Sequence, residues 1–390
     1  MTNTADNKPL VIVGTGLGGY NLAKEFRKIN SETPMVIISQ GEGHFYSKPQ
    51  LSTALSLSKT PSQLVISDVN QMQTQLKATI FTQSCVKNVD RQKKSIQFES
   101  QDQLQDIAYQ DLVLAIGAAP KPFSLLDDHQ HHYRINHLEE YANFIENLPH
   151  YERLCIIGSG LVGIEFAHDL AMAGKKVDVV SLDPCPLYQL APAPIGQALQ
   201  HALEKLNVTF HTQTQLARVC NENEKFEIYL NTGKAITADA VLTAIGLNPN
   251  TQLANMAGIK TEQGIVVDNY LQTSENNVYA LGDCAQINGT CLQYVAPILQ
   301  SARALAQTLA GIPTQVSFPP TPISLKVSSY PVILYPPLTV GEWEFDIQQD
   351  GVKAMYYDSN AILRGYALSG KATEHRQSCS QLLNKTLQMA

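Results

Sequence analysis

An α/β protein with two parallel sheets, followed by a smaller α+β domain, is the fold that the sequence predicts. Two stretches carry this prediction, because each joins a short apolar run to a glycine-rich turn and then to an apolar helix. The first stretch begins at Leu10 and the second at Leu154. A third observation is the change of composition near Phe318, after which prolines cluster and β-rich runs follow.

The first stretch has the features of a nucleotide-binding turn. Residues 10–13 read as a strand buried on both faces, and Gly14, Gly16 and Gly19 follow it with G-x-G-x-x-G spacing. The three glycines allow a tight turn, close approach of a pyrophosphate, and packing of a helix over 20–29. The N-terminus of that helix would present unpaired N–H groups to phosphates. Taken alone, the motif also fits a glycine-rich turn that binds nothing.

The second stretch repeats the first. Gly158, Gly160 and Gly163 follow an apolar strand at the same spacing, and an apolar helix begins directly after them. Two such units in one chain are much more specific than one. The repeat therefore predicts two Rossmann-like dinucleotide-binding units.

The second strands of the two units differ in how they end. The strand over 35–39 ends in Ser39, whereas the strand over 176–183 ends in Asp183, near the place of a ribose-binding carboxylate. Lys175 and Lys176 precede this strand, and we expect both to point to solvent. The sequence thus predicts a ribose carboxylate in the second unit only.

Further segments complete two α/β units. Asp283 follows an apolar strand that begins at Val278, and it either caps the next turn or accepts a hydrogen bond from a ligand hydroxyl. The remaining predicted elements are a helix over 61–72, short strands around Ile80, Val86 and 96–98, strands over 111–116 and 240–245 that lead into Gly–Pro-containing turns, and a helix that opens at 294–297 and ends before Gly311.

Composition excludes several classes of protein. The formal net charge is −7 and the pI is about 5.8, which argues against a general binder of nucleic acid or anionic membranes. No apolar stretch is long enough to span a bilayer, and residues 1–6 lack the charge and apolar core of a signal peptide. The seven cysteines form no C-x-x-C pair, so we expect a reducing cytoplasm and neither a disulfide scaffold nor a metal site.

Taken together, these motifs resemble the flavoprotein superfamily with two dinucleotide-binding domains, the pyridine nucleotide-disulfide oxidoreductases. The resemblance covers nearly the whole chain. It implies that the first glycine motif binds FAD and the second binds NADH, an assignment that the spacing alone leaves open. The implied domains are a split FAD-binding domain over 1–120 and 251–317, an NAD-binding domain over 121–250, and a C-terminal α+β domain over 318–390.

Within this superfamily the run Tyr46–Ser52 resembles the motif of the rubredoxin reductase subgroup, in which the basic residue, here Lys48, contacts FAD. From the residues alone, a solvated lysine is the better interpretation of Lys48, as for lysines in general. The resemblance also implies that Asp283 holds a ribitol hydroxyl and that Lys326 lies near the isoalloxazine. The full set of expected cofactor-binding residues is Gly14, Thr15, Gly16, Gly19, Ser39, Lys48, Val86, Gly158, Gly160, Gly163, Glu165, Asp183, Asp283, Val295 and Lys326.

Missing residues also carry information. Disulfide reductases of this superfamily have a redox C-x4-C pair soon after the FAD motif, and other relatives have one redox cysteine there. Here no cysteine precedes Cys85. The Trp-Ser-Asp-Gln stretch of related ferredoxin reductases is also absent, since Trp343 is the only tryptophan. Electrons would therefore leave from the flavin itself.

The function that follows is an NADH-dependent flavoprotein reductase. Hydride would pass from NADH to flavin N5, and single electrons would then pass to an iron protein. The resemblance implies that this protein is rubredoxin and that rubredoxin supplies an alkane hydroxylase. We expect Glu165 and Lys326 to be catalytic and to form an ion pair beside N5, because pairing relieves the cost of isolated charges in an apolar cleft. Alternatively, both are solvated surface groups. The helix that opens at Val295 would aim its positive end at the flavin N1/O2 edge.

Other functions remain open at this point. The acceptor could be a ferredoxin, or the rubredoxin domain of a nitric-oxide-detoxifying protein. A different class altogether is a nucleotide-sensing flavoprotein with little turnover.

Overall fold

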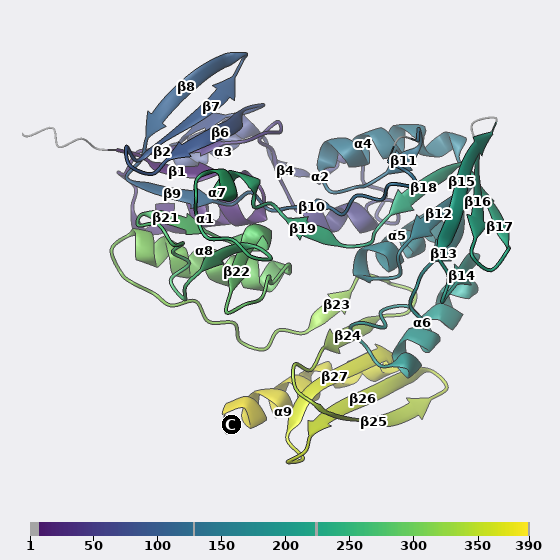
Figure 1. The fold of residues 1–390 in the computed structure, drawn as a ribbon. Coiled ribbons are helices and arrows are strands. Elements are labelled where there is room, and N and C mark those ends of the chain that lie inside the picture. The colour runs from purple at the N-terminus through teal and green to yellow at the C-terminus, as the bar shows by residue number, and fades with distance from the viewer. Residues whose placement is uncertain (1–7, 128, 223–224, 389–390) are drawn as a thin grey trace, which may run out of the picture. The chain divides into compact units, whose positions relative to one another are not determined.

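The computed structural model describes residues 8–127, 129–222 and 225–388 (Figure 1). Residues 1–6, whose composition argues against a signal peptide, lie outside the described part. The chain divides into two compact units, and each is described by itself. Unit 1 comprises Met1–Lys48, Ser62–Ala119 and Leu247–Phe318, and unit 2 comprises Pro49–Pro61, Pro120–Gly246 and Pro319–Ala390. The finer predicted division into separate NAD-binding and C-terminal domains stays a prediction.

Unit 1 is built on a parallel five-stranded sheet. Its strands, in spatial order, are β21 (Val278–Ala280), β9 (Asp111–Leu114), β1 (Leu10–Val13), β2 (Met35–Ile38) and β5 (Thr79–Phe81). The central strand β1 places Leu10 opposite Met35 on one side and opposite Asp111 on the other. These strands are rich in Val, Ile and Leu because both faces of the sheet are covered.

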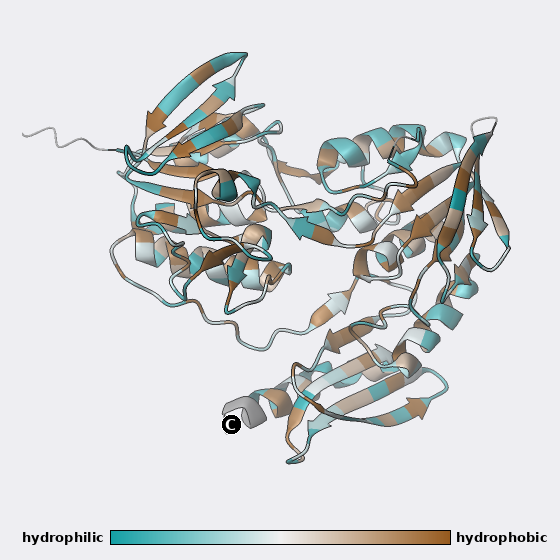
Figure 2. Ribbon diagram, in the orientation of Figure 1, coloured by the Kyte–Doolittle hydropathy of each residue, from teal (hydrophilic) through white to brown (hydrophobic). Residues whose placement is uncertain are grey.

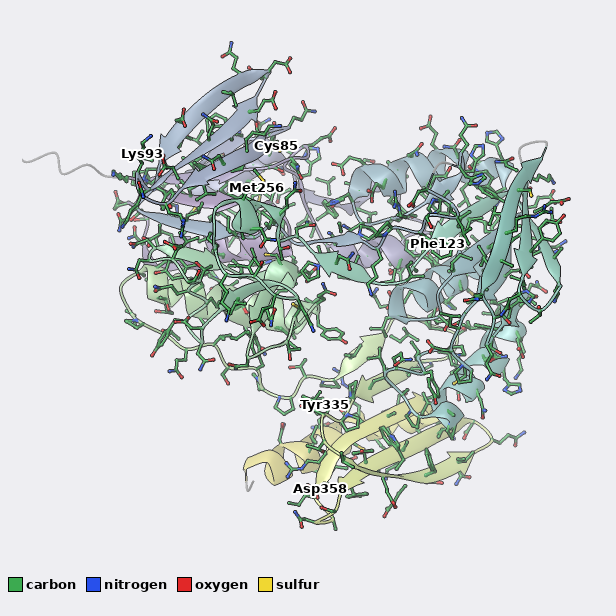
Figure 3. All side chains as sticks on the ribbon, in the orientation of Figure 1. Cys85, Lys93, Phe123, Met256, Tyr335 and Asp358 are labelled. Carbon is green, nitrogen blue, oxygen red and sulfur yellow. The ribbon has the colours of Figure 1, made fainter. Side chains whose placement is uncertain are left out.

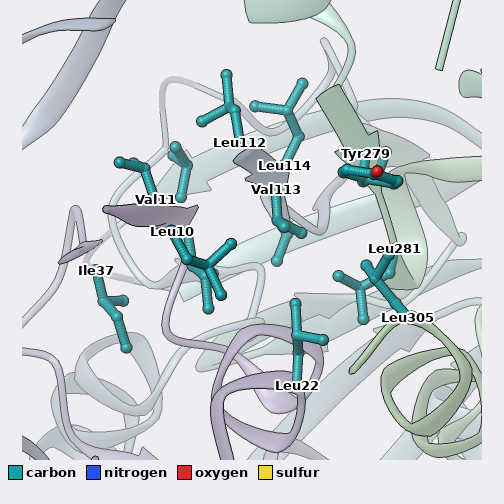
Figure 4. Close-up of a cluster of buried hydrophobic side chains, with 14 of the residues drawn as sticks. Leu10, Val11, Leu22, Ile37, Leu112, Val113, Leu114, Tyr279, Leu281 and Leu305 are labelled. Carbon is teal, nitrogen blue, oxygen red and sulfur yellow. The ribbon is translucent and has the colours of Figure 1, made fainter. Parts of the chain in front are cut away.

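Two helices pack together against this sheet. They are α1 (Leu17–Ile29) and α8 (Val295–Leu309), and the close-up in Figure 4 shows Leu22 and Leu305 from them among strand residues. Gly19, Leu22, Ala23 and Phe26 of α1 are buried. The buried positions recur every three or four residues, which is the period of a helix with one apolar face.

Smaller elements complete unit 1. Strands β6, β7 and β8 form a three-stranded antiparallel sheet, and the residues of β7 alternate between buried and half-buried. Figure 2 shows hydrophilic (teal) and hydrophobic (brown) stretches along β7 and β8. The other elements are β3 (Phe45–Tyr46), β4 (Val65–Ser67), α3 (Val69–Leu76), β6 (Cys85–Asp90), β7 (Ser95–Ser100), β8 (Gln103–Ala108), β10 (Ala118–Pro120), β19 (Leu247–Pro249), α7 (Gln252–Met256), β20 (Ile265–Val267), η3 (Gly282–Cys284) and β22 (Ala285–Ile287). Two short elements, η1 (Lys48–Thr53) and α2 (Pro61–Leu64), lie where the chain passes between the units.

Unit 2 repeats the parallel sheet. The spatial order is β11 (His132–Tyr133), β18 (Ala240–Thr243), β12 (Arg153–Ile157), β13 (Lys176–Val180) and β14 (Val208–His211). The helices are α4 (Leu138–Asn147), α5 (Leu161–Met172) and α6 (Ala193–Glu204), with η2 (Leu148–His150) after α4. An antiparallel sheet of β15 (Leu216–Glu222), β16 (Lys225–Leu230) and β17 (Ala235–Ala238) follows β14.

The C-terminal part of unit 2 is the expected α+β structure. Its antiparallel sheet runs β23 (Ile323–Leu325), β24 (Val332–Tyr335), β27 (Leu363–Gly370), β26 (Gly351–Asp358) and β25 (Gly341–Gln348), and η4 (Lys371–His375) and α9 (Arg376–Gln388) follow. Tyr366 and Leu368 are fully buried and pack with Cys379 and Leu383 of α9. Contacts of α6 with β26 and β27 join this sheet to the rest of unit 2.

Several predicted elements differ from the structure. The predicted helix over 61–72 is instead α2, β4 and α3. Val65 and Ile66 are β-branched and belong to a strand that pairs with β3, and Asp68 then caps α3 in a capping box with Gln71. Helix α1 begins at Leu17 instead of Tyr20, since its first turn starts directly after Gly16.

Strand ends and one lysine are further corrections. The strand predicted over 111–116 ends at Leu114, and the strand over 240–245 ends at Thr243. The ammonium of Lys175 does not point to solvent: it donates to the carbonyls of Leu148 and Tyr151, at 3.1 and 2.5 Å. The long side chain of a lysine can reach backbone carbonyls near the end of a neighbouring helix. Lys176, in contrast, is exposed as expected.

Candidate functional site

The first glycine turn leaves space on one side only. Gly14 has φ +114°, and a Cβ there would lie 2.2 Å from the carbonyl oxygen of Ala115. A Cβ at Gly19 would lie 2.0 Å from the carbonyl oxygen of Gly14. A Cβ at Gly16, however, would meet no atom within 4 Å. Two of the glycines are thus required by the fold, and Gly16 is required only if a ligand occupies the open space.

The second glycine turn has the same construction. Gly158 has φ +109° and a Cβ there would lie 2.5 Å from the carbonyl oxygen of Ala244, while a Cβ at Gly163 would lie 2.2 Å from that of Gly158. Gly160 is open. Neither Gly16 nor Gly160 caps its helix with a side chain, so α1 and α5 both begin with N–H groups suited to an anion.

The strand ends next to the two turns match each other, contrary to the sequence prediction. The hydroxyls of Thr15 and Ser39 are hydrogen-bonded at 2.6 Å, and those of Ser159 and Ser181 at 2.7 Å. Because β13 ends at Val180, Ser181 occupies the position that Ser39 has after β2. The prediction that this strand ends in Asp183 is therefore wrong.

Asp183 lies in the loop beyond that strand. It is half-buried, and its Oδ1 accepts a hydrogen bond from Nε2 of Gln189 at 2.9 Å. This carboxylate has about the expected spacing from the second glycine motif, but it is not at the end of the strand, where a ribose carboxylate was expected. Its role in binding ribose stays a prediction.

In unit 1, the carboxylate of Asp283 is suited to accept a hydrogen bond from a ligand. Its Oδ1 is the only carboxylate oxygen among the described residues that is buried without a hydrogen-bond partner. Burial raises the pKa of Asp283, and the positive charge of Lys48 opposes that shift. A buried carboxylate without a donor is costly, so a ligand hydroxyl fits this position. Of the other expected contacts, Val86 is half-buried on β6 and Val295 is the first, exposed residue of α8.

Unit 2 contains the predicted ion pair between Glu165 and Lys326. Glu165 lies on α5 and is only 5% exposed, and Lys326 follows β23 directly. The ammonium contacts Glu165 Oε2 and also donates to the Pro49 carbonyl at 2.7 Å and to Ser52 Oγ at 3.0 Å. The role of the pair in catalysis stays a prediction.

Both oxygens of Glu165 are occupied by donors from the chain. Oε2 also accepts from the hydroxyl of Ser52 at 2.6 Å, and Oε1 accepts from the backbone N–H of Lys326 at 3.1 Å. Glu165 is the fifth residue of α5, just past the first turn of that helix. The carboxylate thus holds both the backbone and the ammonium of Lys326.

Sequence reasoning missed two members of this cluster, Ser52 and Asp169. Ser52 was included only as the last residue of the run Tyr46–Ser52, with no role of its own. Asp169 was not considered, although it follows Glu165 by one helical turn and so lies on the same side of α5. That spacing, in a helix whose only other polar side chain is His168, was the available signal.

No thiol takes part in this cluster. The first cysteine, Cys85, lies on β6 of unit 1 (Figure 3). Burial raises the pKa of Cys284 to about 12, which makes it a poor redox nucleophile. Within the described residues, no three His, Cys, Asp or Glu side chains are placed to hold a metal ion. No helix in that part of the chain is long and apolar enough to cross a membrane.

Comparison with known proteins gives the family. Residues 8–308 match the model described as pyridine nucleotide-disulphide oxidoreductase, and residues 315–383 match that described as rubredoxin binding C-terminal domain. The chain belongs to the pyridine nucleotide-disulphide oxidoreductases. The resemblance stated from the sequence is confirmed, and so is the predicted fold class.

Relatives place this oxidoreductase more closely. It is 40% identical to a rubredoxin-NAD(+) reductase of Acinetobacter baylyi over 95% of both chains. It is 32% identical to a nitric oxide reductase FlRd-NAD(+) reductase of Aliivibrio fischeri, over 97% of this chain and 99% of that one. The solved complex of putidaredoxin reductase with putidaredoxin has the same fold, with a TM-score of 0.88 at 22% identity, over 97% and 94% of the chains.

As a member of this family the oxidoreductase uses FAD and NADH. The residues present fit a dinucleotide in each unit, because Gly16 and Gly160 open onto free space and Asp283 has an unpartnered buried oxygen. The hydroxyl-bearing ribityl chain of FAD suits that oxygen in unit 1. Among the described residues, unit 2 offers no orphaned carboxylate of this kind.

Proposed function

We propose that this oxidoreductase passes electrons from NADH through FAD to rubredoxin. The observation that carries the proposal is the rubredoxin-binding match over 315–383, since that segment also supplies Lys326 to the cluster with Glu165. One segment would therefore serve both the acceptor protein and the flavin. The 40% identical relative, named for the same reaction, supports the assignment.

FAD, when bound, supplies the chemistry of accepting a hydride and releasing electrons one at a time. The chain supplies binding and orientation. The open side of Gly16 and the N-terminus of α1 receive the FAD pyrophosphate, while Asp283 accepts from a ribityl hydroxyl. The open side of Gly160 and the N-terminus of α5 receive the pyrophosphate of NADH.

Lys326 provides a positive charge for the reduced state of the ring system. Its ammonium is held by Glu165, the Pro49 carbonyl and Ser52, so its position costs no reorganisation during the reaction. With FAD bound, the cation would favour negative charge on the reduced ring system, and the three acceptors keep the cation in place. We infer that Glu165 and Lys326 act as one unit in this step.

The surface of the C-terminal segment supports a protein partner. Leu338 and Val340, in the loop before β25, are 96% and 94% exposed, and Phe345 and Ile347 on β25 are also exposed. Four exposed apolar side chains within residues 338–347 support a contact surface on this stretch of the chain. Apolar contact also avoids the repulsion expected between this acidic chain and an acidic rubredoxin.

The acceptor decides the biological role. Supply of an alkane hydroxylase through rubredoxin, in the cytoplasm, is the role we favour. The relative named for nitric oxide reductase FlRd favours the second candidate, a flavorubredoxin acceptor. A ferredoxin acceptor and a low-turnover nucleotide sensor are the further alternatives.

Reduction of cytochrome c by NADH tests the proposal. The rate should depend strongly on added rubredoxin, and a ferredoxin or an isolated flavorubredoxin domain at the same concentration should support a lower rate. A higher rate with either of those proteins would reassign the acceptor. Flavin reduction without transfer to any iron protein would instead indicate a sensor.

Nucleotide choice gives a prediction for Asp183. If this carboxylate bonds the adenosine ribose, NADH should be preferred over NADPH by more than about tenfold in kcat/KM, because a charged hydrogen bond contributes about 1.5–3 kcal/mol. Asp183→Ser should remove most of this preference. Gln189→Ala, which removes the partner of Asp183 but keeps its charge, is the control. Equal kcat/KM values for the two nucleotides in the wild type would refute the assignment.

A further inference from the structure

We propose that Asp169 is a positioning residue for hydride transfer. It hydrogen-bonds the segment 49–56, and two oxygens of that segment bind the ammonium of Lys326. The proposal rests on the proposed function, in which Lys326 acts on the flavin. The hydrogen bonds of the Asp169 carboxylate go to the backbone of Leu55 and Ser56.

The segment 49–56 provides most of the hydrogen-bond acceptors of the Lys326 ammonium; we call the three acceptors together its seat. The Pro49 carbonyl and the Ser52 hydroxyl are two of the three acceptors of Lys326 Nζ, and Glu165 is the third. Ser52 Oγ also contacts the Pro49 carbonyl at 3.2 Å. Any displacement of this segment therefore changes the position of the ammonium.

Asp169 holds the other end of that segment. Its Oδ2 accepts from the backbone N–H of Leu55 at 3.0 Å, and its Oδ1 accepts from that of Ser56 at 2.7 Å. The residue is 0% exposed. Hydrogen bonds from two consecutive N–H groups to one carboxylate fix both the position and the direction of the backbone.

A single helix thus controls the whole seat. Glu165 and Asp169 lie one turn apart on α5, which is buried from Gly163 to Leu170. Glu165 binds Ser52 and Lys326, and Asp169 binds Leu55 and Ser56. The rigid spacing of the two carboxylates sets the distance between the ends of the segment.

Asp169 also contributes charge. Burial raises the pKa of Asp169, while the positive charge of Lys326 and the bonds from Leu55 and Ser56 lower it. Glu165 and Asp169 are only 5% and 0% exposed, and burial of carboxylates is costly. A carboxylate that only ended a turn could lie at the surface without this cost, so the burial of Asp169 and its two bonds to the segment 49–56 favour a role in holding that segment.

The test compares Asp169→Asn and Asp169→Glu with Asp178→Asn in the flavin-loaded protein. Asp178 is an equally buried carboxylate of unit 2, but it binds Arg153 and His211 on the parallel sheet. Two quantities are measured: hydrogen exchange of peptides covering 49–58, and the rate of flavin reduction at saturating NADH by stopped flow.

Asp169→Asn should accelerate exchange over 49–58 and slow flavin reduction by about tenfold, the effect of losing one charged hydrogen bond. The Kd of NADH should stay within about twofold of wild type, since the variant leaves the second glycine turn intact. Asp169→Glu keeps the charge and should recover part of the rate. Asp178→Asn should lower the melting temperature and change neither measured quantity.

Faster exchange with a wild-type rate of flavin reduction would overturn the proposal, because Asp169 would then be structural only. Equal slowing in Asp178→Asn would overturn it too. If Asp169→Asn does not accumulate as a flavoprotein, Asp169→Glu is measured alone. Faster exchange over 49–58 together with slower flavin reduction supports the proposal, and faster exchange with a wild-type rate overturns it. The test mixture contains no acceptor protein, so its result does not depend on whether rubredoxin is the partner. If NADH failed to reduce the flavin of the wild-type protein, the proposed function would be refuted instead.

Discussion

Gly16→Ala is expected to yield a folded protein that no longer retains FAD, and Gly160→Ala a yellow flavoprotein that no longer binds NADH well. Both glycines have ordinary negative φ, −66° and −74°, and a Cβ at either meets no atom of the chain within 4 Å. The added methyl group therefore costs the free protein little. It lies where the pyrophosphate must approach the backbone.

The size of the effect follows from overpacking, which costs about 1–3 kcal/mol and corresponds to about 5- to 150-fold in affinity. Flavin content after purification and the Kd of NADH measure the two losses separately. Gly14→Ala is the contrasting variant, because its Cβ would collide with the carbonyl of Ala115, and it should lower stability as well. If Gly16→Ala kept its flavin and Gly160→Ala lost it, the two nucleotides would have to be exchanged.

Lys326→Met should slow flavin reduction by NADH by about tenfold or more while FAD stays bound, since a hydrogen bond to a charged group contributes about 1.5–3 kcal/mol. Methionine keeps most of the volume of the lysine stem and removes the charge from the cluster with Glu165 and Ser52. Stopped-flow absorbance of the flavin gives the rate directly.

Glu165→Gln should weaken NADH binding and also slow reduction. The second effect comes from the structure, because both Glu165 oxygens accept bonds from Lys326, and a glutamine amide group can accept at only one atom. Lys371→Met is a matched control, since Lys371 forms an exposed ion pair with Asp350 in the same C-terminal segment. Wild-type rates of flavin reduction in both cluster variants would exclude the catalytic role.

Local sequence was sufficient for the two glycine turns. The apolar strands, the spacing of Gly14, Gly16 and Gly19, and its repetition from Gly158 are properties of short segments, and the structure has both turns as expected. Positive φ at Gly14 and close backbone contact at Gly19 leave few other residues possible there. The fold class could therefore be predicted because it depends on these local constraints.

Strand ends and helix breaks were predicted less well, because they depend on partners. The end of β13 at Val180 follows from its pairing with β12 and β14, so Asp183 lies in the loop beyond the strand and not at its end. The segment 61–72 has a sequence suited to a helix at both ends. Pairing of Val65 with Tyr46 converts its middle to a strand.

The sequence by itself determined two dinucleotide-binding units, the absence of a thiol before Cys85, and, with the family resemblance, the pairing of Glu165 with Lys326. Only the tertiary structure decided how that pair is held. Ser52 is 113 residues from Glu165, and Lys326 is 161 residues from it, so no local pattern joins them. Burial of α5 forces each carboxylate on it to find donors, and the chain supplies those donors from the segment 49–56 and from Lys326.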